Sequence, residues 1–526
     1  MAPQMLFSLF PNNDNAQEIL EANPDFQDTF SGTKCLSFST EFKSKIPSRL
    51  VSFGRNSNHD VRLPSQPPGQ RNYSSGQCYF FLAKSGELIL RELAPSSIRI
   101  SVFDATEDQK KKYSIQGTPP QRVIPKDRTA RTILFLQTGA EFVFRWRIPL
   151  QDDKTDVDLV KRAADLAIPD MVLTSALPQA LAPEHQYTLR SLFSAPAATK
   201  SGTQKSIHRY GELGQGTYGV VYKAVDLSSG EIWAVKEFKP KARTAQWTAS
   251  FRREVEIMAR LQHGNIVNLV HFQNFQLGQP CQLFFPLYKG NLTRLLPAHE
   301  CIGPLPDVPT WAPRLRENIL QALHYLHQNG VVHLDVKPDN ILFDYADGNP
   351  EPTFLLTDFG LSVASSEFKG GRGGGTRFYM DPEVARGENA SYVSDVWSFG
   401  ITFGCVLGYW CRKDMLLTAL DWNAKLQSLG SDTQYDESDS DPDYVRWYAR
   451  VFSLVERGVL PDIFTRLFAA SSHRATTVDC LNASYEQFFG RPQTLPQEAR
   501  FNLEWHIPAL SPNGMSFDIV RGGHGK

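Results

Sequence analysis

The first third of the chain alternates short apolar runs with turn-forming residues. Between residues 33 and 150, the runs RLVSFGR, CYFFLA, GELILRELA, SIRISVF, RTILFLQ and EFVFRWRI are rich in β-branched and aromatic residues. Such runs are typical of strands, and their spacing predicts an all-β sandwich over residues 33–150. The basic run at residues 110–112 and the segment GTPPQRVIPKD (117–127) are predicted to be solvated loop. Residues 1–32 are predicted to be an N-terminal extension.

The pattern changes after residue 150. Residues 155–168 have helical periodicity and residues 192–206 are small and polar, so 151–206 is predicted to be a connector and linker. From 207 to 490, strand-like runs come first and helical patterns such as APRLRENILQALHYLHQNG follow. That order predicts an α+β body with a strand-rich lobe before a helical lobe. Residues 491–526 form an unassigned tail.

Composition and charge narrow the classes of function. A chain of 526 residues suggests two or three domains. With 55 basic and 56 acidic residues, the net charge of −1 gives no reason to expect a nucleic-acid or membrane partner. Seven cysteines without metal-type spacing favour a reducing, intracellular compartment, either cytoplasm or nucleus. We expect no secretory signal at the N-terminus and a solvated loop for the acidic run at 430–443.

Three glycines mark a candidate phosphate-binding loop. Gly214, Gly216 and Gly219 have G-x-G-x-x-G spacing within GELGQGTYGVVYKAV (211–225). This spacing alone is weak, because dinucleotide-binding turns share it. Here a strand pattern follows the last glycine instead of a helix start, which favours a strand–loop–strand flap over phosphates. Without a Cβ, glycine lets backbone amides approach phosphate oxygens.

A lysine and a glutamate further along could complete the phosphate site. Lys236 lies in the strand-like run WAVKEF and is expected to face the α- and β-phosphates of a nucleotide. Glu254 lies on a predicted amphipathic helix, FRREVEIMARL (251–261), with apolar residues on the other side. An ion pair between the two would position the ammonium group and keep it charged.

The segment VVHLDVKPDN (331–340) carries the predicted catalytic groups. Asp335 would accept or orient a hydroxyl proton, and Lys337 would neutralise charge on the transferred phosphoryl group. Asn340, and Asp358 in the later run LLTDFG, would supply the oxygen ligands that Mg²⁺ prefers. Phosphoryl transfer needs positioning and charge compensation more than covalent chemistry, and these groups provide both.

Together these motifs resemble the eukaryotic-type protein kinase family over residues 207–490. SDVWSFG (394–400) is similar to the helix whose aspartate, here Asp395, braces the catalytic loop. The resemblance implies a bilobal α+β fold, ATP and Mg²⁺ as cofactors, and protein substrates. Lys337 within DVKPDN is similar to serine/threonine kinases, and the resemblance implies that Thr376 contacts both Lys337 and Asp335.

The same resemblance implies the adenine site. Val221 and Ala234 are expected above the adenine ring and Leu342 below it. Leu213, directly before the first glycine of the loop, is also expected to bind the nucleotide.

LFFPLYKGNL (283–292) is expected to be the hinge, with Phe285 as gatekeeper. Because Pro286 has no N–H to donate, the adenine bonds are expected on the backbone of Leu287 and Tyr288.

One departure from the family lies beside the catalytic aspartate. Leu334 stands where the family usually has an arginine that binds a phosphate on the activation loop. Leucine cannot bind phosphate, and the loop centre, KGGRGGG (369–375), has no phosphate acceptor. We therefore predict an active kinase that is not gated by phosphorylation of the loop centre.

The segment RLVSFGRNSNHDVRLPS (49–65) resembles the opening of a forkhead-associated (FHA) domain. Such domains bind phosphothreonine through an arginine and a serine from loops, and Arg55 and Ser74 match those positions. Ser75 and Gln77 replace a further arginine and a histidine of the family pattern. The domain is therefore either a phosphothreonine reader or a degenerate sandwich used for packing. A kinase joined to such a domain resembles the checkpoint kinases in architecture.

Two other functions stay open. The first is a pseudokinase scaffold that binds partners through the FHA-like domain, and ATP turnover separates it from an active kinase. The second, a small-molecule kinase, is less favoured because the DFG segment and Thr376 indicate protein substrates.

Overall fold

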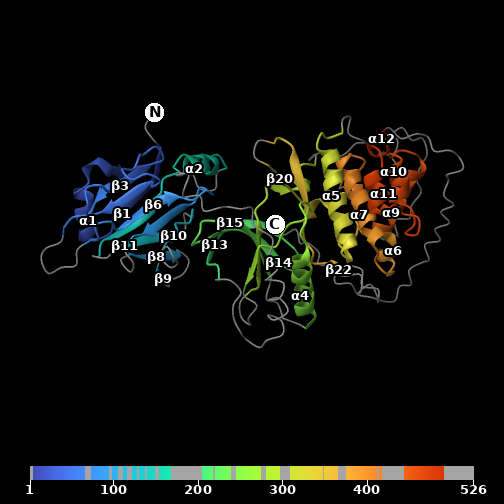
Figure 1. Cartoon of the computed structure of the whole chain (residues 1–526), viewed down its shortest axis with the longest axis horizontal. Helices are drawn as coiled ribbons and strands as arrows, with labels where there is room; N and C mark the ends of the chain where they lie inside the picture. The colour runs from blue at the N-terminus through green and yellow to red at the C-terminus, as the bar shows by residue number, and fades with distance from the viewer. Residues whose placement is uncertain are drawn as a thin grey trace. The chain divides into compact units, whose positions relative to one another are not determined.

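The structure is a computed structural model, drawn in Figure 1. It describes residues 4–490 apart from 66–72, 94–97, 105–110, 115–120, 127–129, 137–138, 149–152, 167–203, 217–218, 239–244, 274–279, 297–307, 347–348, 365–374, 412–413 and 417–442. Within the described residues, no helix is both long enough and apolar enough to cross a membrane. The chain divides into two compact units, Met1–Leu296 with Trp311–Thr402, and Pro297–Thr310 with Phe403–Lys526.

The first unit begins with a β domain built from two sheets. The larger sheet has the strand order β2-β3-β1-β12-β11-β8-β9, and the smaller has the order β10-β7-β6-β4-β5. The strands of the larger sheet are β1 (Met5–Pro11), β2 (Gln27–Phe30), β3 (Thr33–Ser39), β8 (Ile98–Asp104), β9 (Lys111–Ser114), β11 (Ala130–Leu136) and β12 (Glu141–Trp146). Those of the smaller sheet are β4 (Val51–Gly54), β5 (Val61–Arg62), β6 (Cys78–Leu82), β7 (Leu88–Glu92) and β10 (Gln121–Val123).

Aromatic residues from both sheets share one core. The ring of Phe7 on β1 lies 4.9 Å from that of Phe80 on β6 and 4.9 Å from that of Phe144 on β12. All six predicted strands are present, and each is rich in β-branched or aromatic residues, which favour strands. The all-β class of residues 33–150 is therefore confirmed, while the likeness to an FHA domain stays a prediction.

The predicted boundary at residue 33 is wrong. Strand β1 lies inside the larger sheet, paired with β3 on one side and β12 on the other. Its run MLFSLFP is buried at every position except its ends, because it fills the centre of the sheet. Helix α1 (Asp14–Glu21) and the 3₁₀ turn η1 (Pro24–Phe26) then lead to β2. Residues 5–32 thus belong to the β domain and are not an extension.

The predicted solvated loop between residues 110 and 127 is also wrong in part. Residues Lys111–Ser114 form the edge strand β9, and Gln121–Val123 form the edge strand β10. Val123 pairs with Ile89 of β7 and is fully buried. Prolines and lysines obscured these strands, but both residue types are tolerated at sheet edges.

A helix follows the β domain. Helix α2 (Asp153–Leu166) overlaps the predicted helix at 155–168 and buries Leu159 and Ala163 in the core of the β domain. Of the predicted linker, residues 192–203 lie outside the described residues.

The strand-rich lobe follows. Its sheet has the order β13-β14-β15-β17-β16, with all neighbours antiparallel. The elements are β13 (Ile207–Gln215), β14 (Gly219–Asp226), β15 (Ile232–Phe238), helix α4 (Ala245–Arg260), β16 (His271–Gln273) and β17 (Gln282–Pro286). The strand–loop–strand arrangement around the three glycines is confirmed. The strand-rich lobe before a helical part is confirmed as well.

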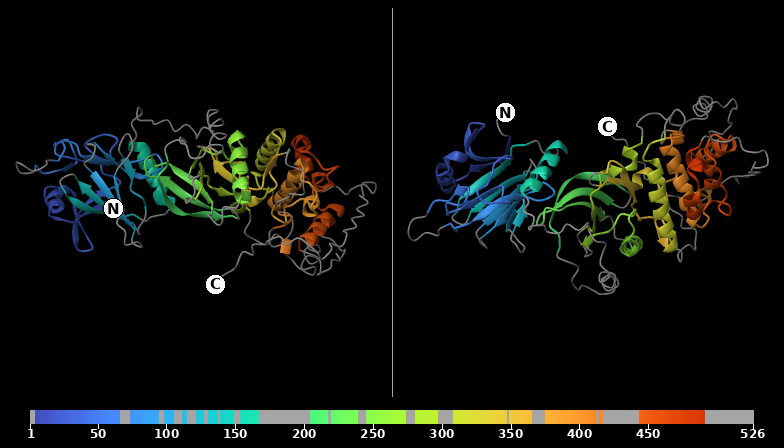
Figure 2. Two further views of the ribbon diagram at one scale, coloured as in Figure 1. Left: turned by 90° about the horizontal axis from the view of Figure 1, so that it is seen from below. Right: turned by 45° about the horizontal axis from the view of Figure 1, so that its top comes forward.

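The helical part of the first unit carries the catalytic segment. Its elements are β18 (Gly290–Asn291), η3 (Leu292–Arg294), α5 (Ala312–Gln328), β19 (Val331–Val332), η4 (Pro338–Asn340), β20 (Ile341–Tyr345), β21 (Pro352–Leu356), β22 (Val363–Ala364), α6 (Pro382–Ala385) and the start of α7 (Tyr392–Val406). Helices α5 and α7 lie side by side in every view (Figures 1 and 2), and His327 of α5 bonds to Asp395 of α7.

The second unit contains the end of α7 and the last described helices. These are η6 (Asp414–Leu416), α9 (Asp443–Glu456), α10 (Ile463–Leu467), α11 (Thr477–Asn482) and α12 (Tyr485–Phe489). Trp410 and Trp447 meet edge to face in its core, with ring centroids 5.6 Å apart. The acidic run from residue 430 to 442 and the tail after 490 lie outside the described residues.

Candidate active site

Lys236 joins two carboxylates from distant parts of the chain. Strand β15 carries the lysine, helix α4 carries Glu254, and Asp358 follows β21. The Nζ atom of Lys236 donates to Glu254 Oε1 at 2.6 Å and to Asp358 Oδ1 at 2.8 Å. The predicted Lys236–Glu254 pair is therefore formed, and Asp358 is a second partner that the sequence did not reveal.

The charged groups of Lys236, Glu254 and Asp358 shift one another's pKa values. Burial lowers the pKa of Lys236, but Glu254 and Asp358 outweigh it, so the pKa lies above its usual value. Burial raises the pKa of Glu254 despite the nearby ammonium group. Burial also opposes ionisation of Asp358, yet the ammonium group of Lys236 lowers the pKa of Asp358 to about 2. Asp358 is therefore a carboxylate at neutral pH.

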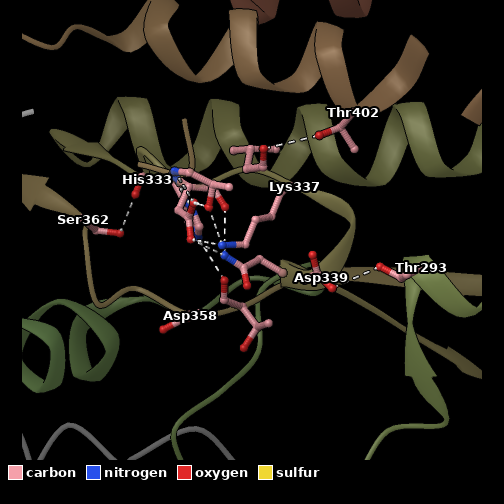
Figure 3. A network of polar contacts seen from close by, with 12 residues as sticks. Thr293, His333, Lys337, Asp339, Asp358, Ser362 and Thr402 are labelled. Carbon is pink, nitrogen blue, oxygen red and sulfur yellow. Dashed lines mark hydrogen bonds and ion pairs between the residues drawn. The ribbon is translucent and has the colours of Figure 1, made fainter. Parts of the chain in front are cut away.

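Asp335, Lys337 and Thr376 form a closed polar cluster, of which Lys337 is labelled in Figure 3. The Nζ atom of Lys337 donates to Asp335 Oδ2 at 2.7 Å and to Thr376 Oγ1 at 2.6 Å. The hydroxyl of Thr376 donates to Asp335 Oδ1 at 2.7 Å, and its backbone N–H donates to the same oxygen at 3.1 Å. The predicted contacts of Thr376 with Lys337 and Asp335 are confirmed.

The side-chain amide of Asn340 is oriented by Asp335. Its Nδ2 donates to the backbone oxygen of Asp335 at 2.9 Å and to Oδ2 of the same residue at 2.8 Å. With the nitrogen so engaged, the amide oxygen is the atom left for a cation. An amide oxygen together with the carboxylate of Asp358 is a donor set that suits Mg²⁺. Asn340 and Asp358 therefore fit the metal that the sequence implies.

Asp395 braces the catalytic segment, as predicted. Its fully buried carboxylate accepts from the backbone N–H groups of His333 at 2.9 Å and Leu334 at 2.8 Å. Leu334 and Asp358 both have positive φ, at 68° and 64°. Such non-glycine residues cost of order 1–3 kcal/mol each, and here the surrounding bonds hold them in place.

Leu334 packs into an apolar cluster that links the catalytic segment to both ends of the described activation segment. The buried members are Val332, Leu334, Val384 and Ala390, and the partly buried Leu361, Val363, Met380 and Tyr392 pack against them. The sequence showed that an arginine was missing, but not what the leucine contacts. Residues 365–374, which include all of the loop centre except Gly375, lie outside the described residues.

The three glycines differ in their surroundings. A Cβ added at Gly214 or Gly216 would meet nothing within 4 Å, so backbone there is open to a ligand. A Cβ at Gly219 would lie 2.3 Å from the backbone oxygen of Glu237 on the neighbouring strand. Gly219 is therefore needed for the close approach of β14 to β15, a role that the motif did not reveal.

The predicted adenine residues come from four places around the hinge. Val221 and Ala234 lie on β14 and β15, Leu342 lies on β20, and all three side chains are half-buried. Leu213 on β13 is 49% exposed.

The predicted hinge starts on β17 and continues past the end of that strand. Ala234 pairs with Phe285, and Leu287 and Tyr288 come after the strand ends. Burial, with a contribution from Asp344, raises the pKa of Tyr288 to about 12, so its phenol is neutral. The adenine contacts themselves stay predictions.

The two residues predicted for phosphothreonine binding lie on neighbouring loops of the β domain. The backbone N–H of Arg55 donates to the backbone oxygen of Ser74 at 3.2 Å, and the Arg55 side chain is exposed. Gln77 Oε1 accepts from the Ser74 N–H at 3.1 Å, which fixes the second loop. His59, which the sequence did not single out, is buried against Gly54 and Gly76.

The comparisons with known proteins concern the first of these sites, the one that contains Lys236 and Asp335. The protein kinase domain family matches residues 207–417. Calcium/calmodulin-dependent protein kinase type II of Caenorhabditis briggsae is 31% identical over 208 residues, which is 38% of this chain and 36% of that protein. Calcium-dependent protein kinase 8 of Arabidopsis thaliana is 35% identical over 198 residues, which is 36% of this chain and 34% of that protein.

Serine/threonine-protein kinase fused of Drosophila melanogaster is 29% identical over 195 residues, which is 36% of this chain and 22% of that protein. The chain thus spans about a third or less of the length of the curated relatives it matches. Residues 207–417 are therefore similar to a protein kinase domain.

Proposed function

We propose that the chain is an ATP-dependent serine/threonine protein kinase with Asp335 as its catalytic base. The observation that carries this proposal is the cluster of Asp335, Lys337 and Thr376, which lies in the same fold unit as the Lys236–Glu254–Asp358 trio. All the charged groups that phosphoryl transfer to a hydroxyl needs are present and ionically paired.

Each group has a role in the proposed reaction. A serine or threonine hydroxyl attacks the γ-phosphorus of ATP, the bond from that phosphorus to the β,γ-bridging oxygen breaks, and ADP leaves. Asp335 orients the attacking hydroxyl and accepts its proton. Lys337 offsets charge on the transferred phosphoryl group, and Lys236, held by Glu254, binds the α- and β-phosphates.

Asn340 and Asp358 would hold Mg²⁺, which supplies charge neutralisation at the phosphates when bound. The low pKa of Asp358 favours this role, because the carboxylate does not have to lose a proton before it binds a cation.

We further propose that phosphorylation of the activation loop is not the switch. In the usual arrangement an arginine beside the catalytic aspartate pairs with a loop phosphate. Here Leu334, 5% exposed, lies among apolar residues that include Val363 and Met380. Hydrophobic contact of this kind needs no phosphate, so it supports an activation segment that is anchored without modification.

For the β domain, the proposed function is recognition of phosphothreonine in partner proteins. The support is the adjacency of Arg55 and Ser74, whose loops are joined by the backbone bond between them. A phosphothreonine peptide array with Arg55→Ala as control tests it. Signal that is lost in the variant supports the proposal, and equal or absent signal removes it, leaving a packing role.

Phosphate transfer from Mg-ATP to a basic protein substrate tests the kinase proposal. We expect phosphoserine or phosphothreonine in the product, and a loss of at least a hundredfold in Asp335→Ala. Equal transfer by both proteins, or none by either while both still bind nucleotide, would favour the alternative of a pseudokinase scaffold.

A further inference from the structure

We infer that the β domain is a fixed support of the strand-rich lobe of the same chain, docked on the turn between β14 and β15. The two parts share a small apolar core. Ile89 and Val123 come from the β domain, and Val225 and Leu227 come from the lobe. Their exposed fractions are 1%, 0%, 0% and 8%, so neither pair faces solvent.

Three backbone carbonyls of the turn each accept a hydrogen bond from the β domain. Leu227 O accepts from the Val123 N–H at 2.7 Å. Ser228 O accepts from Gln121 Nε2 at 2.7 Å, and Gly230 O accepts from the hydroxyl of Ser85 at 2.6 Å. Leu227 and Gly230 are buried, so their carbonyls would be costly to leave unpaired, whereas the bond to the exposed Ser228 adds a third link between the two parts.

The donors are themselves held in position. The guanidinium group of Arg91 donates from Nε to Gln121 Oε1 at 2.7 Å and also donates to that oxygen from Nη2. The amide of Gln121 must then direct its nitrogen toward Ser228. Such supporting bonds are typical of a built interface and are absent from chance contact.

A buried ion pair lies at the side of the interface. Lys126 Nζ lies 3.4 Å from Glu87 Oε1, with only 6% and 2% of the two side chains exposed. The other oxygen of Glu87 accepts from the hydroxyl of Tyr210 on β13 at 2.5 Å. Because Tyr210 belongs to the lobe, the buried carboxylate gains one of its bonds only when the two parts are together.

The turn is shaped for this contact. Gly230 has a φ of 77°, and a Cβ there would lie 2.9 Å from the side chain of Ala83. Asp226 accepts bonds from the backbone N–H of Ser228 at 2.8 Å and from its hydroxyl, which rigidifies the turn. Tyr210 and Val225 belong to the two strands whose other ends carry the glycine-rich loop. The β domain therefore anchors the far end of that hairpin.

Hydrogen exchange on the full chain tests this inference without requiring activity. The Val123 amide, which bonds across the interface, is expected to be protected. In the double variant Gln121→Ala/Tyr210→Phe we expect it, together with the amides of Leu227 and Gly230, to exchange about tenfold faster or more. The matched control is Gln262→Ala, an exposed glutamine of the same unit away from the interface, which should leave these rates unchanged.

Either of two results would overturn the inference. One is an unprotected Val123 amide in the unmodified protein, and the other is equal rates in the unmodified protein and the double variant. Dilution shows whether the contact lies within one chain or between two copies of the chain. Protection that is independent of protein concentration supports docking within one chain, whereas protection that is lost on hundredfold dilution would assign the contact to a second copy.

Discussion

At the residue scale, the hydroxyl of Thr376 joins the two groups that the proposed reaction needs. It accepts from Lys337 and donates to Asp335, so it fixes both side chains at once. Thr376→Val keeps the shape but removes both bonds, and we expect kcat to fall by about tenfold to a hundredfold. Thr376→Ser keeps the hydroxyl and should retain most of the activity. Steady-state kinetics with saturating ATP compare the two, and equal losses would argue against this role.

At the same scale, the low pKa of Asp358 predicts how the stability of the protein depends on pH. Its folded pKa, about 2, lies below the ordinary value of 3.8, so between these values the unfolded chain binds more protons. The stabilisation is therefore fully present above about pH 4 and is lost as the pH falls toward 2. We expect urea unfolding of Asp358→Asn to depend less on pH in this window than that of the unmodified protein. The exposed Asp158 offers the control Asp158→Asn, and equal slopes for all three proteins would contradict the shift.

The motifs predicted several contacts of single residues correctly. The Lys236–Glu254 pair follows from residue types that need each other, and the contacts of Thr376 were implied by the resemblance to protein kinases. It could not reveal that Gly219 is required by the backbone oxygen of Glu237, because that distance depends on how two strands pair.

At the element scale, the hairpin of β13 and β14 contains glycines that serve different purposes: Gly219 allows close strand packing, and Gly216 leaves open space for a ligand. Gly219→Ala would place a Cβ against the backbone of β15, which cannot move without disturbing the sheet. We expect it to lower the free energy of unfolding by about 1–3 kcal/mol. Gly216→Ala meets open space and should change stability by less than about 0.5 kcal/mol, although it can weaken nucleotide binding. Urea titration of both variants measures these changes. A Gly219→Ala variant that is as stable as the unmodified protein would refute the role of Gly219 in strand packing.

The apolar cluster around Leu334 gives a second prediction at this scale. Leu334→Ala removes a buried side chain that links the catalytic segment to the activation segment, so we expect a loss of about 2–5 kcal/mol in stability. Val478→Ala, at a position that is 46% exposed, should change it by less than about 0.5 kcal/mol. Thermal unfolding compares them. A loss at Leu334 no larger than at Val478 would show that the cluster does not anchor the segment.

Elements with strong periodicity were predicted correctly, and those that depend on partners were not. Helix α4 buries Val255 and Met258 as its pattern requires, and Leu261, directly after the helix, is buried as well. Strand β1 was missed because its short run follows no turn signal, and it gains its partners β3 and β12 only in the folded sheet. Strand β10 was missed because its neighbouring prolines indicated a loop.

At the scale of the whole molecule, the division into an all-β domain and an α+β kinase domain followed from the order of strand and helix patterns. The bonds between Val123 and Leu227, or between Tyr210 and Glu87, could not be predicted in the same way. They join surfaces far apart in sequence, and no local pattern records them. If the β domain supports the lobe, the loops that carry Arg55 and Ser74 and the strands that dock on the lobe are separate features of one domain.

Phosphate transfer by fully dephosphorylated protein tests the central claim most directly. The protein is treated with phosphatase, loss of phosphate from residues 358–383 is verified by mass spectrometry, and transfer from Mg-ATP is measured with treated Asp335→Ala as control. We predict a rate within about twofold of the untreated protein and at least a hundredfold above the control. A rate that falls to the level of Asp335→Ala after phosphatase treatment would contradict the account.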